Sequence, residues 1–158
     1  STNKMIKSTE ICLPKNIVWC DGTINKTSEK YRRILKEKLK KYTISEKNLF
    51  CSEKIIYKKS EKKDIYDLYD AHLIDMESES VQKISKKKNI PFVALKISLD
   101  DSETSLPEDL IKIYMKEKSK IYLFKCIFYL PTIFKLAIDY QRSKKKLDQV
   151  CRHLFNSS

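Results

Sequence analysis

The chain has 158 residues, which is enough for one domain and short for two. Hydrophobic residues make up 41% and charged residues 34%, so a core can form and general disorder is not expected. The single glycine, Gly22, excludes the phosphate-binding loops of P-loop and dinucleotide-binding folds, because those loops need several glycines within a few residues.

The net charge of +12 first suggests nucleic acid or an anionic membrane as partner. However, 29 of the 33 basic residues are lysines and 4 are arginines, although arginine is the better bidentate ligand for phosphates and guanines. Such a composition, rich in Lys, Ile, Asn and Tyr, is typical of AT-biased coding. We therefore interpret the charge mainly as solvated surface and do not expect nucleic acid as the partner.

The five cysteines are scattered and contain no C-x-x-C pair, which is typical of reduced thiols rather than of a disulfide framework or a zinc site. His72 and His153 are the only histidines, and neither belongs to a cluster with metal-ligand spacing. We expect no metal and no cofactor, and a structural role for His72. The polar N-terminus lacks the apolar segment of a signal peptide, so we expect a cytoplasmic protein.

The first elements are predicted from apolar runs and periodicity. Residues 16–20 read as a buried strand that ends at Asp21-Gly22, and residues 28–42 read as an amphipathic helix with Ser28 as N-cap. The spacing of its apolar residues predicts one inward face, formed by Tyr31, Ile34, Leu35 and Leu39. Short strands are expected at 49–51 and 55–57, followed by a helix over 61–69.

The middle of the chain predicts a strand at 71–74, a helix over 78–88 with Val81 and Ile84 inward, and a strand at 92–97. Strand, helix and strand in about thirty residues are typical of a parallel βαβ unit with a right-handed crossover. The chain is therefore predicted to be α/β.

From residue 105 to Phe155 the pattern is helical, with an interruption before Pro131. The apolar stretch 121–138 contains Lys125 and Lys135 and is broken by Pro131, so we expect no membrane span. It reads either as a pair of covering helices or as a surface that lies on a bilayer.

Acidic residues follow both central strands. Glu77 follows the first, and Asp100 and Asp101 follow the second, at the sheet edge where parallel folds bind ligands. A carboxylate at a helix N-terminus could accept hydrogen bonds from two vicinal sugar hydroxyls, and an aspartate in the next loop could donate a proton to a leaving base. On spacing alone, the structural reading is favoured: these acids start a helix and cap a loop, because acids are common in such loops.

Two stretches resemble a known family. Asp75-Met-Glu-Ser-Glu-Ser-Val81 and Asn89-Ile-Pro-Phe-Val-Ala-Leu-Lys-Ile-Ser-Leu-Asp-Asp101 resemble the second half of the purine nucleoside phosphorylase and nucleosidase superfamily. Residues 106–110 and 130–139 resemble the basic C-terminal tail of its hopanoid-associated branch. The resemblance implies a three-layer phosphorylase/hydrolase-like α/β fold, here incomplete, with a helical C-terminal tail.

The resemblance also implies roles for individual residues. Met76 would lie against the sugar face, and Glu77 would bind the ribose hydroxyls. Asp100, or Asp101 if the register shifts by one, would be catalytic at the purine N7. The implied reaction is cleavage of the N-glycosidic bond of a purine nucleoside by water or by inorganic phosphate as co-substrate. In the hopanoid-associated branch the implied substrate is a lipid-linked adenosine, which releases adenine.

The chain departs from the family in lacking its Gly-rich first half, and Lys96-Ile-Ser-Leu99 replaces the usual motif before Asp100. We therefore expect residues 1–158 to form a single truncated domain, with an α/β part over 16–106 and a helical tail over 107–155. Such a chain would be an impaired copy or one segment of a split protein, and either homo-oligomerisation or a partner chain supplying the missing half could complete the sheet.

A second hypothesis belongs to another class: a basic, non-enzymatic module that binds an anionic membrane surface or RNA through its lysines. It would place the protein at the inner face of the membrane as a peripheral protein. A third is a decaying gene product that no longer folds well alone.

Overall fold

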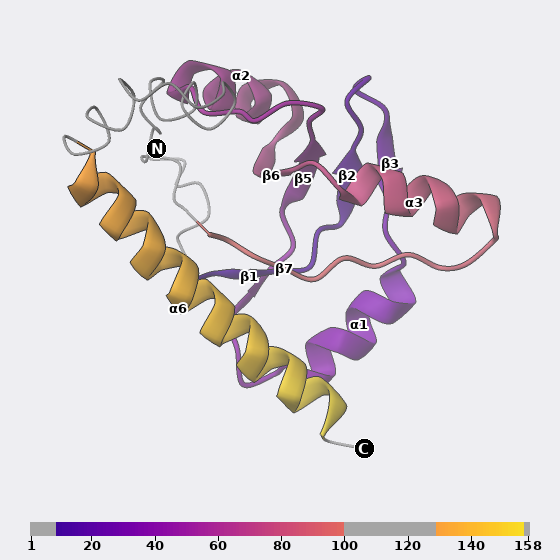
Figure 1. Ribbon diagram of the computed structural model, residues 1–158. Helices are drawn as coiled ribbons and strands as arrows, with labels where there is room; N and C mark the ends of the chain where they lie inside the picture. The colour runs from indigo at the N-terminus through magenta and orange to yellow at the C-terminus, as the bar shows by residue number, and fades with distance from the viewer. Residues whose placement is uncertain (1–8, 100–128, 157–158) are drawn as a thin grey trace.

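The computed structural model describes residues 9–99 and 129–156, which form a mixed α/β structure (Figure 1). The strands in this part of the chain are β1 (Ile11–Cys12), β2 (Asn16–Val18), β3 (Ile24–Lys26), β4 (Ile44–Ser45), β5 (Asn48–Cys51), β6 (Ala71–Asp75) and β7 (Lys96–Ile97). The helices are α1 (Glu29–Lys38), α2 (Lys59–Tyr69), α3 (Ser78–Lys87) and α6 (Leu130–Phe155).

The larger sheet has the strand order β3-β2-β5-β6. Strands β2, β5 and β6 are parallel, and β3 returns antiparallel to β2 after a turn at Gly22. The strands β5 and β6 are joined through α2 and form a parallel β-α-β crossover. Its core is a cluster of buried residues, namely Ile17, Leu49, Cys51 and Ala94.

A second sheet has the order β4-β1-β7, with β7 antiparallel to β1. The long helix α6 runs past this sheet toward the end of α1 (Figure 1). The Ser143 hydroxyl on α6 donates a hydrogen bond of 2.9 Å to the carbonyl of Ser98, directly after β7. Val150 of α6 is buried in one cluster with Ile11 and Leu39, so α1, α6 and the small sheet share a core.

The α/β class is confirmed, and so are most of the predicted elements, with changed ends. The first strand is confined to Asn16–Val18, and the first helix ends at Lys38 instead of residue 42. The second helix begins at Lys59, two residues earlier than expected, and α6 begins at Leu130 with Pro131 in its first turn. Proline is favoured there because the missing N–H would have no helical partner.

The predicted strand at 55–57 was wrong, and the predicted strand at 92–97 is reduced to Lys96–Ile97. The carbonyl of Phe92 accepts a 2.7 Å hydrogen bond from the Ser28 N–H. This part of the chain therefore contacts the start of α1 instead of pairing in a sheet. Because β7 pairs with β1 in the other sheet, the parallel βαβ unit predicted over 71–97 is not formed. In the larger sheet, a parallel βαβ unit is formed instead by β5, α2 and β6.

The predicted inward face of α1 is right only in part, because Leu39 is buried and Leu35 half-buried, and that of α3 was wrong. On α1, Tyr31 and Ile34 are about two-fifths exposed, whereas Leu39 just after the helix is buried. On α3, Val81 and Ile84 are exposed, and the buried positions are polar: Ser78, Gln82 and Ser85. These polar side chains have partners at defined positions, among them the Trp19 indole for Gln82 and the Ile90 carbonyl for Ser85. Hydrogen-bonded polar groups can therefore take the inward face without a large desolvation cost.

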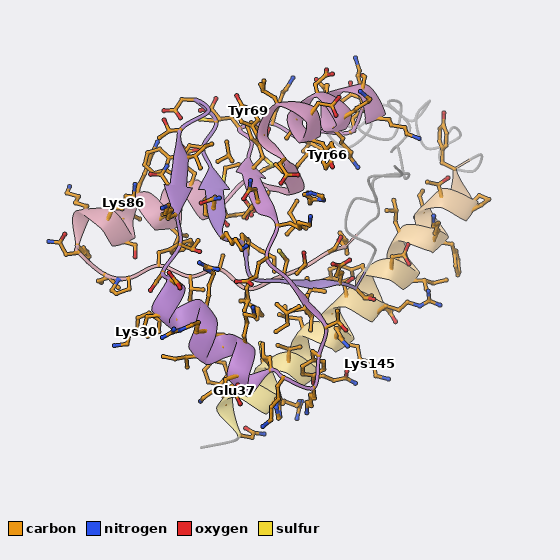
Figure 2. The ribbon with its side chains drawn as sticks, turned by 180° about the vertical axis from the view of Figure 1, so that it is seen from behind. Lys30, Glu37, Tyr66, Tyr69, Lys86 and Lys145 are labelled. Carbon is orange, nitrogen blue, oxygen red and sulfur yellow. The ribbon has the colours of Figure 1, made fainter. Side chains whose placement is uncertain are left out.

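The buried His72 on β6 fits the structural role expected for it. Its Nε2 lies 3.0 Å from a carboxylate oxygen of Asp70, and the ring of Tyr66 on α2 packs edge-on against the imidazole at 4.8 Å. Tyr66 and Tyr69 both belong to α2, as Figure 2 shows. These contacts hold α2 against the edge of the larger sheet.

The acidic loop at 100–104 and the helical pattern from 105 to 128 lie outside the described residues. Among the helices of the described residues, none has the length and hydropathy that a membrane span requires.

Candidate functional site

The carboxyl ends of three parallel strands meet at one edge of the larger sheet. Val18 on β2 is in register with Phe50 on β5, which is in register with Ile74 on β6. The residues that follow these strands therefore gather at one edge, the position at which parallel α/β sheets bind ligands. The segment Asp75-Met76-Glu77 ends β6 and leads into α3 there.

The Asp75 carboxylate is the most highly connected polar group at this edge. It accepts a hydrogen bond of 2.5 Å from the Ser78 hydroxyl and one of 3.3 Å from the Ser78 N–H, at the start of α3. The Lys96 ammonium lies 2.5 Å from the same carboxylate, and the Cys51 thiol lies 3.3 Å from it. Asp75 thus joins β5, β6, α3 and β7 at one point.

These contacts change the acid–base properties of the group. Burial by itself raises the pKa of Asp75, but the hydrogen bonds from Lys96 and Ser78 outweigh burial and hold the pKa below its ordinary value of 3.8. The same environment acts in the opposite direction on the neighbouring thiol, because burial and the Asp75 carboxylate raise the pKa of Cys51 to about 12. At neutral pH the pair is a carboxylate and a neutral thiol, which excludes Cys51 as a nucleophile.

Met76 and Glu77 follow Asp75 and are exposed, Met76 to 47%. Glu77 is the N-cap residue of α3, and one of its carboxylate oxygens lies 3.3 Å from the Met76 N–H. A carboxylate at this position is stabilised by the positive end of the helix and remains accessible to a ligand. The structure therefore places both predicted sugar-binding residues at the carboxyl edge, with Asp75 holding the segment that carries them.

Glu79, which the sequence analysis did not single out, connects α3 to the turn after β2. Its carboxylate accepts a hydrogen bond of 2.8 Å from the Cys20 N–H and forms an ion pair of 2.6 Å with Lys83. The Cys20 thiol lies 3.6 Å from Glu79 and also from Glu53. Partial desolvation and these two carboxylates raise the pKa of Cys20, so this exposed thiol is not activated either.

A cavity of about 400 Å³ opens between the ends of β2 and β5 and the first turns of α2. Its size falls in the range of small-molecule sites, and it combines apolar and charged walls. The lining residues are Cys20, Phe50, Ser52, Glu53, Lys54, Ile56, Glu61, Asp64 and Ile65. The Ser52 N–H donates a hydrogen bond of 2.8 Å to the carbonyl of Asp75, which ties the cavity wall to the Asp75-Met76-Glu77 segment.

The predicted catalytic Asp100 and its alternative Asp101 lie outside the described residues. Within the described ranges, no group of three or more His, Cys, Asp or Glu side chains could hold a metal ion.

The central role of Asp75 and its partner Lys96 was missed by sequence reasoning, although one signal was present. An aspartate three residues before a serine, at a helix start, is a known hydrogen-bonding pattern, and Asp75 and Ser78 have this spacing. The pairing of Asp75 with Lys96 had no sequence signal.

No protein-family model matches the sequence, and no curated protein matches it significantly. Solved structures do match. A 5'-methylthioadenosine/S-adenosyl homocysteine nucleosidase from Campylobacter jejuni superposes with a TM-score of 0.60 at 16% identity, over 68% of this chain and 55% of that one. The native futalosine hydrolase of Helicobacter pylori gives a TM-score of 0.63 at 13% identity, over 97% of this chain and 61% of that one.

The chain has the fold of these nucleosidases. A third neighbour, the Helicobacter pylori 5'-methylthioadenosine/S-adenosyl homocysteine nucleosidase in complex with a pyrrolidine ligand, gives a TM-score of 0.61 at 15% identity over 96% of this chain. The chain spans only 55–62% of the length of these three proteins. The shared fold agrees with the α/β fold that the resemblance drawn from the sequence implies.

Proposed function

We propose that this chain carries the ribose-binding part of a nucleosidase-type active site and takes part in cleavage of the N-glycosidic bond of a purine nucleoside. The observation that carries the proposal is the position of Met76 and Glu77 at the carboxyl edge of a sheet whose fold is shared with nucleosidases. Two of those neighbours are named for adenosine thioethers and one for futalosine, so a purine nucleoside is the favoured substrate class.

In this proposal Glu77 accepts hydrogen bonds from the two vicinal ribose hydroxyls, and Met76 covers the sugar face. Asp100, or Asp101, gives a proton to N7 of the base, so that the electron pair of the breaking C1'–N9 bond leaves with a neutral purine. Water or inorganic phosphate forms the new bond at C1', and the aspartate regains its proton from the attacking water or from solvent. In its most specific form, the proposal is that the substrate is a lipid-linked adenosine, as the resemblance to the hopanoid-associated branch implies.

Since the chain spans little more than half of its neighbours' length, we propose that another polypeptide segment completes the site, as a second copy or as a partner chain. Adenosine binding then needs only the part present here, whereas turnover needs the complete site. The two properties are therefore tested separately.

Binding is tested by thermal melts of the purified chain with adenosine and with uridine. Any ligand that binds only the folded state raises the melting temperature, by an amount set by its concentration relative to its dissociation constant. We expect an upward shift with adenosine, no shift with uridine, and loss of the adenosine shift in Glu77→Gln. Glu37→Gln, an exposed glutamate on α1 that contacts Lys40 at 3.6 Å, is the matched control and should keep the shift.

Equal shifts with adenosine and uridine, or an unchanged shift in Glu77→Gln, would overturn the proposal. If adenosine binds, release of adenine is measured with and without inorganic phosphate, which separates phosphorolysis from hydrolysis. Asp100→Asn should then abolish adenine release while leaving the adenosine-induced shift in place.

A further inference from the structure

The first half of α6 exposes a line of large apolar side chains. Leu130, Phe134 and Ile138 are spaced four residues apart and are 50%, 69% and 45% exposed. Residues at this spacing lie on one side of a helix. Ile133 and Tyr140 flank the line and are also exposed, to 37% and 55%.

This apolar line faces away from the side of α6 that contacts the described part of the fold. The side of α6 that contacts the fold is marked by Ser143 and Val150, which are buried. Phe134 precedes Ser143 by nine residues, and at about 100° per residue these two side chains lie on opposite sides of the helix. The apolar residues therefore contribute nothing to the core that α6 forms with β7 and α1.

Basic residues lie beside this line and in the turns that follow it, although the Lys146 ammonium packs over the Tyr42 ring at 4.7 Å. Between Leu130 and Lys146, five residues are basic (Lys135, Arg142, Lys144, Lys145 and Lys146), and Asp139 is the only acid. Asp139 is held within the helix at 3.9 Å from Arg142, and its side chain is 15% exposed. Lys145 extends away from the body of the protein (Figure 2). The exposed side of α6 thus combines large apolar side chains with almost uncompensated positive charge.

We propose that the exposed side of α6 binds the surface of an anionic lipid bilayer. Leu130, Phe134 and Ile138 would enter the boundary between headgroups and acyl chains, with Tyr140 at headgroup level. The lysines beside them would contact lipid phosphates, and each such cation strengthens binding to an anionic surface.

The charge distribution favours a membrane over two other occupants. A second copy docked on the same face would bring two strongly positive surfaces together, in a protein whose net charge is already +12. RNA would neutralise the lysines but would leave Leu130 and Ile138 in water, because nucleic acids bind through phosphate contacts and aromatic stacking. Of these three occupants, an anionic bilayer satisfies both the apolar line and the cations.

The test is flotation of the purified chain with phosphatidylcholine vesicles that contain phosphatidylglycerol, and with vesicles of phosphatidylcholine alone. We expect binding to the anionic vesicles that weakens with added salt. The double variant Phe134→Gln, Ile138→Gln should lower the apparent lipid affinity by about tenfold or more. Leu68→Gln, which replaces a 72% exposed leucine on α2, is the matched control and should bind like the wild type.

A second pair of matched variants tests how much the α6 lysines contribute to vesicle binding. Lys144→Glu, Lys145→Glu on α6 should weaken binding by more than Lys87→Glu, Lys88→Glu, which makes the same change of net charge at the end of α3. All substituted side chains are on the surface, and a cooperative melt of each variant verifies its folding.

Absence of binding to anionic vesicles, or equal loss in the α6 and control variants, would overturn the proposal. A dimer in light scattering that the Phe134→Gln, Ile138→Gln variant loses would assign the surface to a second copy instead. Vesicle binding is independent of nucleoside binding, so Glu77→Gln should leave it unchanged.

Discussion

The Asp75 carboxylate at the end of β6 lies 2.5 Å from the ammonium group of Lys96 at the start of β7. These strands belong to different sheets, so this ion pair bridges the two halves of the fold. The side chains of Asp75 and Lys96 are only 12% and 29% exposed, which shields the pair from solvent. The pair also anchors the residue immediately before Met76 and Glu77.

Replacing Asp75 by Asn should destabilise the protein. The amide keeps the shape of the side chain, but it removes the charge that pairs with Lys96 and accepts from Ser78. Hydrogen bonds to charged groups of this kind contribute about 2 kcal/mol. Chemical denaturation of Asp75→Asn should show a loss of that order. Asp67→Asn, which breaks an exposed ion pair with Lys63 on α2, should change the free energy of unfolding by less than about 0.5 kcal/mol.

The stabilisation from Asp75 should depend on pH in a defined range. Because the pKa of Asp75 in the folded protein lies below its ordinary value of 3.8, the contribution is complete above that value and is lost as the pH falls through the folded pKa. The difference in unfolding free energy between the wild type and Asp75→Asn should therefore stay constant from neutral pH down to about pH 4 and then shrink. If this difference disappeared near neutral pH, the stabilisation would come from a group other than the ionised Asp75 carboxylate.

Gln82 on α3 should be required for stability, although it is a polar residue. It is 1% exposed, accepts a 2.9 Å hydrogen bond from the Trp19 indole and donates one of 3.3 Å to the Lys26 carbonyl. Gln82→Leu leaves both partners unsatisfied and should cost about 2 kcal/mol. Trp19 is the only tryptophan, so its fluorescence should change in the folded variant as well.

Gln149→Leu, at an exposed position of α6, is the matched control for this substitution and should leave stability within about 0.5 kcal/mol. Equal behaviour of the two variants would contradict a structural role of the Gln82 side chain.

Gly22 should not tolerate a side chain. Its φ of +85° is favourable only for glycine, and a Cβ atom there would lie 3.0 Å from the hydroxyl oxygen of Tyr69. Gly22→Ala should cost about 1–2 kcal/mol in thermal or chemical denaturation. Adding Tyr69→Phe removes the contacting oxygen, so the double variant should lose less stability than the sum of the two single variants. Simple additivity would show that the backbone angle alone sets the cost.

The cysteines should differ sharply in their reaction with iodoacetamide. Burial raises the pKa of both Cys12 and Cys51 to about 12, whereas Cys20 is exposed. In the folded protein, mass spectrometry of peptides should find Cys20 alkylated, slowly at neutral pH because its own pKa is raised, and Cys12 and Cys51 protected. All three should react in denaturant. Rapid native-state labelling of Cys51 would mean that the carboxyl edge of β5 opens easily.

The local elements could be predicted from the sequence because their signals lie within a few residues. Helix α3 could be predicted from the periodicity of apolar and polar residues and from the lysines at its end. Pro131 likewise indicated where α6 begins. The position of Met76 and Glu77 after a strand and before a helix could be predicted for the same reason. The family resemblance rested on this segment, and the neighbouring structures share the fold that it implies.

The inward faces of the helices and the strand partners were decided by contacts between distant residues. Gln82 is buried because Trp19, 63 positions earlier, donates to it, and no periodicity within α3 contains that information. Lys96 joins β7 to β1 and pairs with Asp75, instead of extending the sheet of β6. Helices and turns depend on residues that are neighbours in the sequence, so the amino-acid sequence by itself determined them. The pairing of strands and the burial of helix faces depend on which surfaces meet, and only the tertiary structure decided which ones do.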